Sequence, residues 1–279
     1  MVAPKFTPDP SPDGGLRIPR EHGAWSVLVT SLCAGAAVGG GLTRATIILW
    51  IAVLAGFIGW ANAVAWWKDS GGHPIGTAPF RWAAALLSAA LAGCAWLVFG
   101  AGYLALPWLL STVAGCALWL SLRRQHIARS IWAELAGIAG LSALAAASQY
   151  TSAGRLSRAT FGIWLVCLLV FIGSLLHVRF VVRHAAARRQ RLAARLRAGL
   201  PSGLYHLAAL GVLGLAATVQ LTPPIALLLL APSVAKAWWA ILIPSTTAPP
   251  QIRRIGRIEL VYAALFVLLA LVTARAWPQ

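Results

Sequence analysis

Acidic side chains are scarce in this 279-residue sequence, which holds six Asp and Glu residues against 23 Lys and Arg residues. Charged residues of both signs make up only 10% of the chain, whereas roughly 25% is typical of soluble domains. Apolar residues account for 59%. A chain with so few charges cannot cover its surface with groups that water solvates, so we expect its solvent to be lipid.

The formal net charge of +17 does not indicate a nucleic-acid partner. Nucleic-acid-binding proteins gather basic residues in a basic domain or along one helix face. Here the basic residues stand in short clusters between long apolar runs, where they are typical of membrane topology signals. We therefore expect a lipid bilayer, and no nucleic acid, as the partner.

Cysteine is also rare, and its placement offers no redox or zinc chemistry. All four cysteines fall inside apolar runs, without a CxxC pair or a histidine at ligand spacing: Cys33, Cys94, Cys116 and Cys167. Free cysteine packs much like a small apolar residue. We expect these four to be core residues.

The chain divides at about residue 20. Residues 1–19 are rich in Pro, Gly, Ser and Asp and contain no apolar run, which predicts a flexible cytoplasmic tail rather than a signal peptide. Residues 20–279 form a single predicted transmembrane domain, with a basic cytoplasmic loop at 183–202. The basic part of that loop is expected to be helical, and either binds lipid headgroups or forms a lid over an anionic substrate.

Nine apolar runs are long enough, at about 20 residues, to cross a bilayer as helices. They lie near 24–42, 45–67, 82–101, 103–122, 131–150, 159–181, 203–221, 223–243 and 258–275. The predicted fold class is an all-α polytopic bundle. Gly35 and Gly39 stand one turn apart in the first run, and the run 131–150 consists mostly of Ala, Gly and Ser. Small residues allow helices to approach closely, so we expect both runs to be packed inside the bundle.

Orientation follows from the basic residues, which accumulate in cytoplasmic segments. With the N-terminus inside and nine crossings, 18 of the 23 Lys and Arg residues lie on the cytoplasmic side and four lie outside, with Lys236 counted apart. We therefore expect a multi-pass protein of the bacterial inner membrane, with its C-terminus outside.

The scarce polar residues gather on the predicted cytoplasmic side, which predicts a polar cavity open to the cytoplasm. Twelve of them are candidate ligand-binding residues: Glu21, His22, Asn62, Asp69, Glu134, His177, Arg179, Arg183, His206, Lys236, Arg254 and Glu259. Ionisable groups within a bilayer are costly unless they are paired or hydrated, so each needs a partner or a use.

Several of these residues allow two interpretations. Glu134 and Glu259 form ion pairs with an arginine such as Arg129, Arg254 or Arg257, or else they bind protons or substrate. Glu21 and His22 either anchor the start of the first helix or belong to a site.

The basic candidates also allow more than one interpretation. Arg179 and Arg183 share a helix face and either hold a phosphate or extend to lipid headgroups. Lys236 follows a dozen apolar residues and can reach the headgroups only if its helix ends soon after it.

Three motifs resemble those of the YwiC-like family of bacterial polytopic membrane proteins. They are the opening Arg20-Glu21-His22-Gly23-Ala24-Trp25, the stretch from Gly173-Ser174 to Arg179, and the stretch from Arg254 to Glu259. The resemblance runs from about residue 18 to the end and is most specific in the opening motif. It implies a topology and a set of recurrent polar positions rather than a reaction.

A more distant resemblance is to UbiA-type prenyltransferases, which also have nine helices, an inside N-terminus and an active site at the cytoplasmic ends of helices two and six. That family's first motif would place aspartates four and eight residues after Asn62, where this chain has Trp66 and Ser70, with Asp69 out of register. Its second acidic motif has no counterpart beyond His177. Because those carboxylates hold prenyl diphosphate through magnesium, we do not expect a magnesium site here.

These observations lead to one principal hypothesis and two alternatives. The principal hypothesis is a UbiA-like membrane protein that binds an amphipathic anionic lipid or isoprenoid, as a binding protein or a divergent transferase. Its head would meet Arg179, Arg183, Lys236 and Arg254. The alternatives are a permease-like carrier in which Glu134 and Glu259 are coupling groups, and a non-catalytic membrane subunit.

Overall fold

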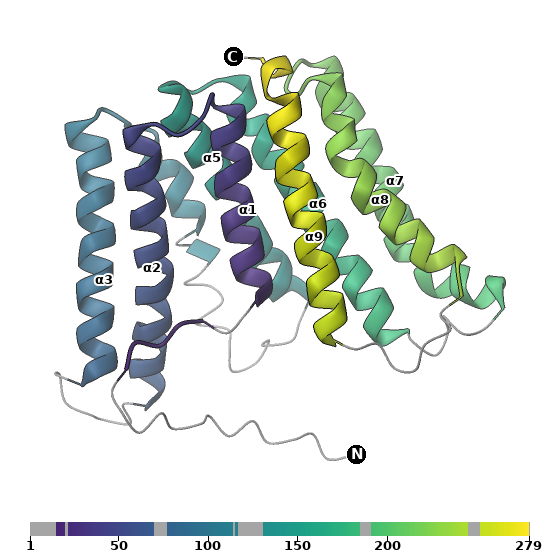
Figure 1. The fold of residues 1–279 in the computed structure, drawn as a ribbon, viewed down its shortest axis with the longest axis horizontal. Coiled ribbons are helices and arrows are strands. Elements are labelled where there is room, and N and C mark those ends of the chain that lie inside the picture. Colours follow the sequence, from purple (N-terminus) through teal and green to yellow (C-terminus); the bar gives the residue numbers. More distant parts are fainter. Residues whose placement is uncertain are drawn as a thin grey trace. The chain divides into compact units, whose positions relative to one another are not determined.

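All regular structure in the described part of the chain is helical. The computed structural model describes residues 15–19, 22–69, 77–113, 115–116, 131–184, 191–244 and 252–278. The helices are α1 His22–Val38, α2 Arg44–Asp69, α3 Ala78–Ala95, α5 Ile131–Ala153, α6 Arg158–Arg183, α7 Leu192–Thr218, α8 Leu227–Leu242 and α9 Ile252–Thr273 (Figure 1). A π-helical turn, Trp96–Gly100, follows α3, and residues 106–113 form a further helical stretch. One 3-10 turn, Pro224–Ala226, precedes α8, and another, Ala274–Ala276, follows α9.

Each of the nine predicted spans contains helical residues in the part that the structure describes, which for the span 103–122 ends at residue 116, so the predicted all-α fold is confirmed. Seven segments are long and apolar enough to cross a membrane: 44–67, 78–100, 131–153, 158–183, 192–218, 224–242 and 254–276. The apolar part of α1, Gly23–Val38, is shorter. The chain is a multi-pass membrane protein.

The start of the seventh span was predicted wrongly. We expected the membrane span to begin at residue 203, after a basic loop with a helical part, but α7 begins at Leu192 and continues without a break into the span. A search for apolar residues misses this start because it is amphipathic: Arg195 is buried, whereas Arg197 is exposed. Pro201 lies inside the helix, which its ring usually disfavours, and this also hides the helix from the sequence.

The chain forms two compact units, residues 1–20 with 51–96 and residues 21–50 with 97–279. In the first unit, α2 packs on α3 at Gly59, where a Cβ atom would lie 3.0 Å from the Cβ of Leu86. Asn62 is fully buried and holds the backbone of Arg17, donating to its carbonyl oxygen at 2.9 Å and accepting from its N–H at 3.1 Å. Residues at the end of the predicted tail therefore contact α2.

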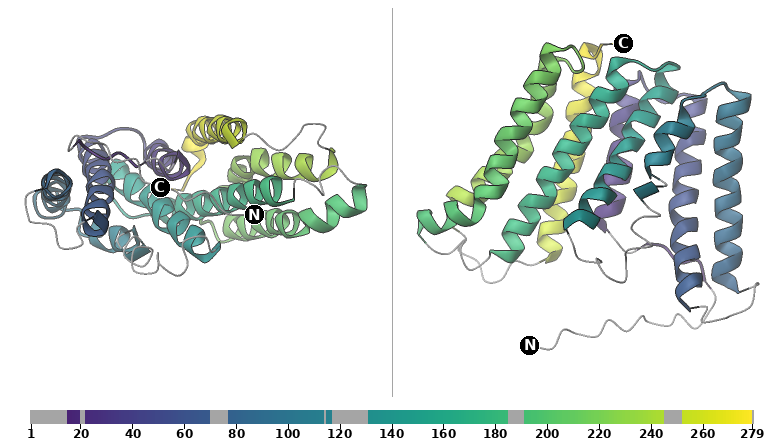
Figure 2. Two further views of the ribbon diagram at one scale, coloured as in Figure 1. Left: turned by 90° about the horizontal axis from the view of Figure 1, so that it is seen from below. Right: turned by 180° about the vertical axis from the view of Figure 1, so that it is seen from behind.

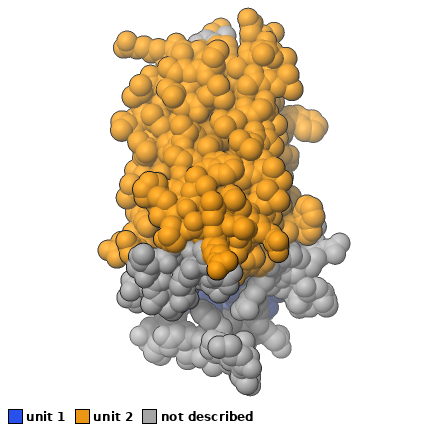
Figure 3. Space-filling model, turned by 90° about the vertical axis from the view of Figure 1, so that its right-hand side faces the viewer, with its two compact units in different colours: residues 1–20, 51–96 blue, residues 21–50, 97–279 orange. Residues whose placement is uncertain are grey.

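The second unit, orange in Figure 3, contains the other long helices. In it α6 lies between α5 and the pair α7 and α8, and α1 packs against α5, α6 and α9 (Figure 2). The contact between α1 and α5 is the closest described: a Cβ atom at Gly35 would lie 2.2 Å from the carbonyl oxygen of Ala145, and one at Gly39 would lie 2.4 Å from the Cβ of Ser152. The predicted close packing of these two runs is confirmed.

Four hydroxyl side chains, Thr43, Thr46, Ser148 and Ser152, join the ends of α1 and α5 to the start of α2. We call them the hydroxyl network. Thr46 Oγ1 lies 2.8 Å from Thr43 Oγ1 and 3.0 Å from Ser152 Oγ, and Ser152 donates to the carbonyl of Gly41 at 2.6 Å. Ser148 donates to a carbonyl of α1 at 2.8 Å and accepts from the indole of Trp50 at 3.0 Å. These contacts fix one end of the bundle without any charge.

Candidate functional site

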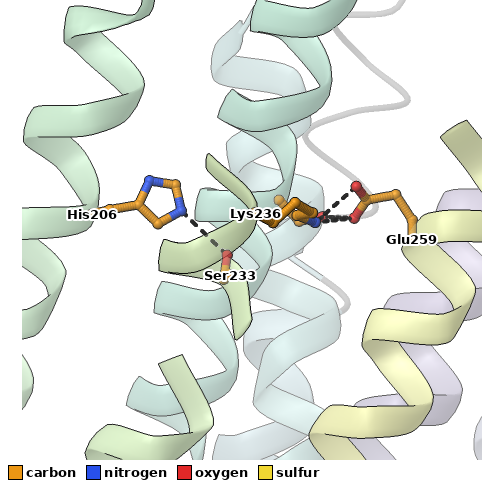
Figure 4. Close-up of polar contacts among 5 residues, drawn as sticks. His206, Ser233, Lys236 and Glu259 are labelled. Atoms are coloured by element: carbon orange, nitrogen blue, oxygen red, sulfur yellow. Dashed lines mark hydrogen bonds and ion pairs between the residues drawn. The ribbon is translucent and has the colours of Figure 1, made fainter. Parts of the chain in front are cut away.

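A buried ion pair between α8 and α9 forms the centre of the candidate site. Lys236 on α8 is only 7% exposed, and its Nζ lies 2.8 Å and 2.7 Å from the two carboxylate oxygens of Glu259 on α9 (Figure 4). Ser174 on α6 donates a short hydrogen bond to the same carboxylate, and its Oγ lies 3.4 Å from Nζ. The ring of Tyr262 lies below the ammonium, with its centroid 4.6 Å from Nζ. We call these four residues the charged layer.

The charged layer lets two full charges exist among apolar helices. Removing a charge from water costs several kcal/mol, and the cost is recovered only when the opposite charge and further hydrogen bonds are close. Lys236 has both carboxylate oxygens, the face of Tyr262 and the hydroxyl of Ser174. The layer therefore joins α6, α8 and α9 through electrostatic contacts.

A histidine on α7 extends the polar contacts across the bundle. The fully buried His206 places Nδ1 2.7 Å from the carbonyl oxygen of Ser202 and Nε2 3.2 Å from the hydroxyl of Ser233 (Figure 4). Because a carbonyl oxygen only accepts, Nδ1 carries the proton of the neutral ring, and Nε2 accepts from Ser233. Ser233 stands three residues before Lys236, so α8 presents both residues on one side. At Gly173 on α6 a Cβ atom would lie 2.9 Å from Nε2, so glycine is needed there.

A second ion pair joins α5 to α6. Arg179 donates from Nε to a carboxylate oxygen of Glu134 at 2.8 Å. The side chain of Glu134 is 42% exposed and that of Arg179 is 15% exposed. The Nη2 atom of Arg179 is buried and has no hydrogen-bond partner in the part of the chain that the structure describes. Arg183, one turn further along the same face, is exposed.

An apolar groove of about 550 Å³ lies between α5 and α6, the two helices that the second ion pair joins. It is lined by Trp132, Leu135, Ala136, Ala139, Leu168 and Ile172. Leu168, Ile172 and Arg179 are four and seven residues apart on α6, a spacing that puts them on one helix face. A molecule lying in the groove along α6 would therefore reach the guanidinium of Arg179.

Comparison with known proteins identifies the first part of the chain. Residues 18–149 match the family model described as YwiC-like protein. This segment is similar to the YwiC-like family over slightly less than half of the chain. The match confirms the resemblance that the opening motif from Arg20 to Trp25 indicates. No curated protein and no solved structure shows significant similarity to the chain.

The YwiC-like segment contains α1 to α3 and most of α5, including Glu134 and the α5 wall of the groove. The charged layer lies after it. The motifs from Gly173 to Arg179 and from Arg254 to Glu259 are outside the matched range, so their resemblance to the YwiC-like family stays a prediction. The more distant likeness to UbiA-type prenyltransferases also stays a prediction.

The predicted site residues do not form one cluster. Lys236, Glu259 and His206 are brought together around α8, whereas Glu134 and Arg179, with Arg183 one turn on, belong to the groove between α5 and α6.

The remaining predicted residues lie elsewhere or cannot be placed. Asn62 is in the first unit, His177 is buried on α6 and Arg254 is exposed. Glu21 and the side chains of His22 and Asp69 lie outside the described residues.

Two details of the sequence-based prediction were wrong, and one open alternative is decided. Glu259 pairs with Lys236 rather than with an arginine. Of the two interpretations of Lys236, extension to the headgroups does not hold, because its ammonium points into the bundle toward α9. His206 lies well inside α7 instead of at its start, because α7 begins eleven residues before the predicted residue 203.

Sequence reasoning missed the hydroxyl and aromatic partners of the charges. Ser174, Ser233 and Tyr262 carry no charge and sit in apolar runs, where serine and tyrosine are common. The Gly173-Ser174 pair was the available signal, since two small residues in a helix allow neighbouring side chains to approach. Arg195 was counted only as part of a basic loop, although it is 6% exposed in the structure.

Proposed function

We propose that this membrane protein binds an amphipathic anionic lipid, with an acyl or isoprenoid chain in the groove between α5 and α6 and the anionic head at Arg179. The proposal rests on an apolar groove of about 550 Å³ and on helical spacing, which puts Arg179 on the same face of α6 as Leu168 and Ile172, two of the lining residues. Such a site would match a lipid, with apolar surface for the hydrocarbon chain and a cation for the head. Burying apolar surface contributes about 25 cal/mol of binding free energy for each Å².

The Nη2 atom of Arg179 would supply the polar half of the site. Nη2 of Arg179 is buried without a described partner, and a buried donor left unpaired costs about 1 to 3 kcal/mol. A phosphate or carboxylate oxygen would accept from Nη2 while Glu134 keeps the bond to Nε. Arg183 would add a second, solvated cation at the mouth.

The proposal includes a location. If the N-terminus lies inside, as the distribution of basic residues indicates, Arg179 and Arg183 lie at the cytoplasmic face of the inner membrane. The head of the lipid would then come from the inner leaflet, where anionic lipids interact favourably with basic residues.

This is a proposal of binding. After Asp69 the sequence contains only two acidic residues, Glu134 and Glu259, and each is engaged by a cation. A transferase acting on the bound lipid would have to work without a pair of free carboxylates in this part of the chain.

The test fills the groove with a bulky side chain and measures how this changes stabilisation of the protein by lipids. Thermal unfolding of the delipidated protein in detergent is followed during titration with phosphatidylglycerol, with phosphatidylcholine as the uncharged-head comparison. We expect phosphatidylglycerol to stabilise the wild type, Ala136→Trp to remove the part of this stabilisation that depends on the groove, and Arg179→Gln to weaken that part at least about tenfold. Ala231→Trp, at an exposed alanine of α8, is the matched control and should keep the wild-type response.

Two results would contradict the proposal. One is equal stabilisation of the wild type by the two lipids, since the head then contributes nothing. The other is an Ala136→Trp variant that folds and responds to phosphatidylglycerol as the wild type does.

A permease-like carrier is the second candidate, and the pair Lys236–Glu259 favours it. Ionisable residues within membrane helices often bind coupling ions or substrates. A carrier must open to both sides in turn, so a cysteine introduced at Thr46 in a chain lacking its native cysteines should react with a membrane-impermeant reagent. A lipid-binding protein with a closed outer end should protect that cysteine.

A further inference from the structure

Arg195 is a buried cation whose counter-charge is missing from the described chain. It lies near the start of α7, is 6% exposed, and has two guanidinium nitrogens, Nε and Nη1, that are buried without a hydrogen-bond partner among the described residues. Burying a charged group without partners costs several kcal/mol, and such groups usually coordinate an ion or water. The observation therefore calls for a partner from outside the chain.

Among the acidic side chains that the structure describes, none is available to pair with Arg195. Between Glu134 and Glu259 the sequence contains neither Asp nor Glu. Those two glutamates are already bound by Arg179 and Lys236.

The position of Arg195 is fixed by the packing of α7 on α8. Four and eleven residues further along α7, Gly199 and His206 occupy the same face. A Cβ atom at Gly199 would lie 2.5 Å from Ile241 of α8, and His206 contacts Ser233 of α8. Arg195 thus continues the buried face of α7 by one turn, beside the apolar cluster of Phe180, Val181, Ala240 and Ile241.

The start of α7 adds further donors to the same region. Its N-cap residue, Arg191, makes no side-chain capping hydrogen bond, so the first backbone N–H groups of a 27-residue helix lack that partner. Side chains on a helix lean toward its N-terminus, which brings the guanidinium of Arg195 toward these groups. A helix N-terminus and an arginine together favour a phosphate-like oxyanion.

We propose that Arg195 and the first turn of α7 form a binding site for a phosphate oxyanion, supplied by a phospholipid head or by free phosphate. The site is built on α7 where it packs on α6 and α8, and uses none of the groove residues, so it does not depend on the proposed function. Its ligand would compensate the one arginine that the helices bury without an ion-pair partner in the described chain.

The test compares two arginines of the same helix. Thermal unfolding in detergent is followed during separate titrations with inorganic phosphate and with phosphatidylglycerol, against sodium chloride of equal ionic strength and phosphatidylcholine. The variants are Arg195→Gln and, as the matched control, Arg197→Gln, at an exposed position two residues away. We expect a saturable stabilisation in the wild type and the control, weakened at least about tenfold in Arg195→Gln.

The two titrations identify the source of the anion. Stabilisation by inorganic phosphate indicates a free oxyanion, and stabilisation by phosphatidylglycerol alone indicates a lipid head. The proposal is overturned if neither stabilises the wild type, or if Arg195→Gln responds like Arg197→Gln.

A third variant keeps the proposal testable if Arg195→Gln does not fold. Arg195→Lys keeps the charge but loses the planar fork of donors, so we expect it to bind phosphate more weakly than the wild type. An unchanged midpoint concentration in Arg195→Lys would mean that the guanidinium does not contact the anion. In ligand-free protein, Arg195→Met should raise the unfolding temperature, because it removes an unpaired buried charge. A lowered temperature would show that backbone carbonyls of the chain satisfy Arg195, which would also overturn the proposal.

Discussion

The charged layer and the hydroxyl network bury polar groups at two levels of the same helical unit in different ways. Along α6, Ser174 of the charged layer lies about 20 Å from Thr160, which contacts Gln149 beside the hydroxyl network. The hydroxyl network uses neutral groups, and each of its four hydroxyls has a described hydrogen-bond partner. The charged layer uses two full charges, Lys236 on α8 and Glu259 on α9, and a hydroxyl from α6.

The difference suggests which buried polar groups hold the helices together and which ones bind a ligand. Neutral hydroxyl groups are inexpensive to bury once they are hydrogen-bonded, and α5 supplies them where α1 approaches closely. Charges are expensive to bury, and elsewhere in this unit Arg179 and Arg195 keep donors without a described partner. We therefore interpret the hydroxyl network as holding the bundle together, and we propose that the two arginines bind ligands.

The largest expected effect is from breaking the charged layer on one side. Lys236→Met leaves Glu259 as an unpaired carboxylate inside the bundle and should lower the free energy of unfolding by about 3 to 5 kcal/mol. Thermal or denaturant unfolding in detergent measures it. Arg257→Met, at an exposed residue of α9, is the control and should change the free energy by no more than about 0.5 kcal/mol.

The double variant Lys236→Met/Glu259→Leu tests whether the loss comes from the unpaired charge. Apolar residues often replace a buried ion pair at little cost, so most of the stability should return. If the double variant were as unstable as Lys236→Met alone, the loss of stability would come from packing. The difference between the charged layer and the hydroxyl network would then not be electrostatic.

An intermediate effect is expected where α1 meets α5. Gly35→Ala places a Cβ atom 2.2 Å from the carbonyl oxygen of Ala145, so the helices must separate, which should cost about 1 to 3 kcal/mol. Gly211→Ala on α7 meets nothing within 4 Å and should instead stabilise the helix slightly, because alanine is the better helix former. If Gly35→Ala lowers the free energy of unfolding and Gly211→Ala raises it, the close contact is supported. Changes of the same sign in both variants would contradict it.

The smallest effect is expected within the hydroxyl network. Ser148→Ala removes the hydroxyl that accepts from Trp50 and donates to Leu32, and should cost about 1 kcal/mol. Ser111→Ala removes an exposed hydroxyl that bonds one turn back and should cost less. A Ser148→Ala variant less stable than Lys236→Met would reverse the order of the two regions.

Much of the fold could be predicted from the sequence, because membrane helices are long apolar runs. Apart from the starts of α7 and α9, the predicted ends agree with the described helices to within a few residues, and the run 103–122 lies partly outside the described residues. The contact of Gly35 and Gly39 with α5 was also predictable, since a small-residue pair and a small-residue helix favour each other. The start of α7 was missed because an inward arginine does not resemble a helix core. Hydropathy records residue type and does not record which face is buried.

The site was less predictable, because its pairings depend on which helices become neighbours. Arg254 and Arg257 stand closer to Glu259 in the sequence than Lys236 does, and only the packing of α9 on α8 selects Lys236. The groove between α5 and α6 carries no sequence signal, since its lining residues resemble any lipid-facing residues. Arg179 was chosen from the sequence for its spacing to Arg183, and the structure adds the apolar groove beside it.

The structure of the protein in nanodiscs containing phosphatidylglycerol tests the central claim most directly. We predict acyl-chain density along Leu135, Ala139 and Ile172, continuous with a head whose oxygen lies within hydrogen-bond distance of Nη2 of Arg179. A groove occupied by a segment of the chain itself, with no lipid head at Arg179, would contradict the proposed binding site.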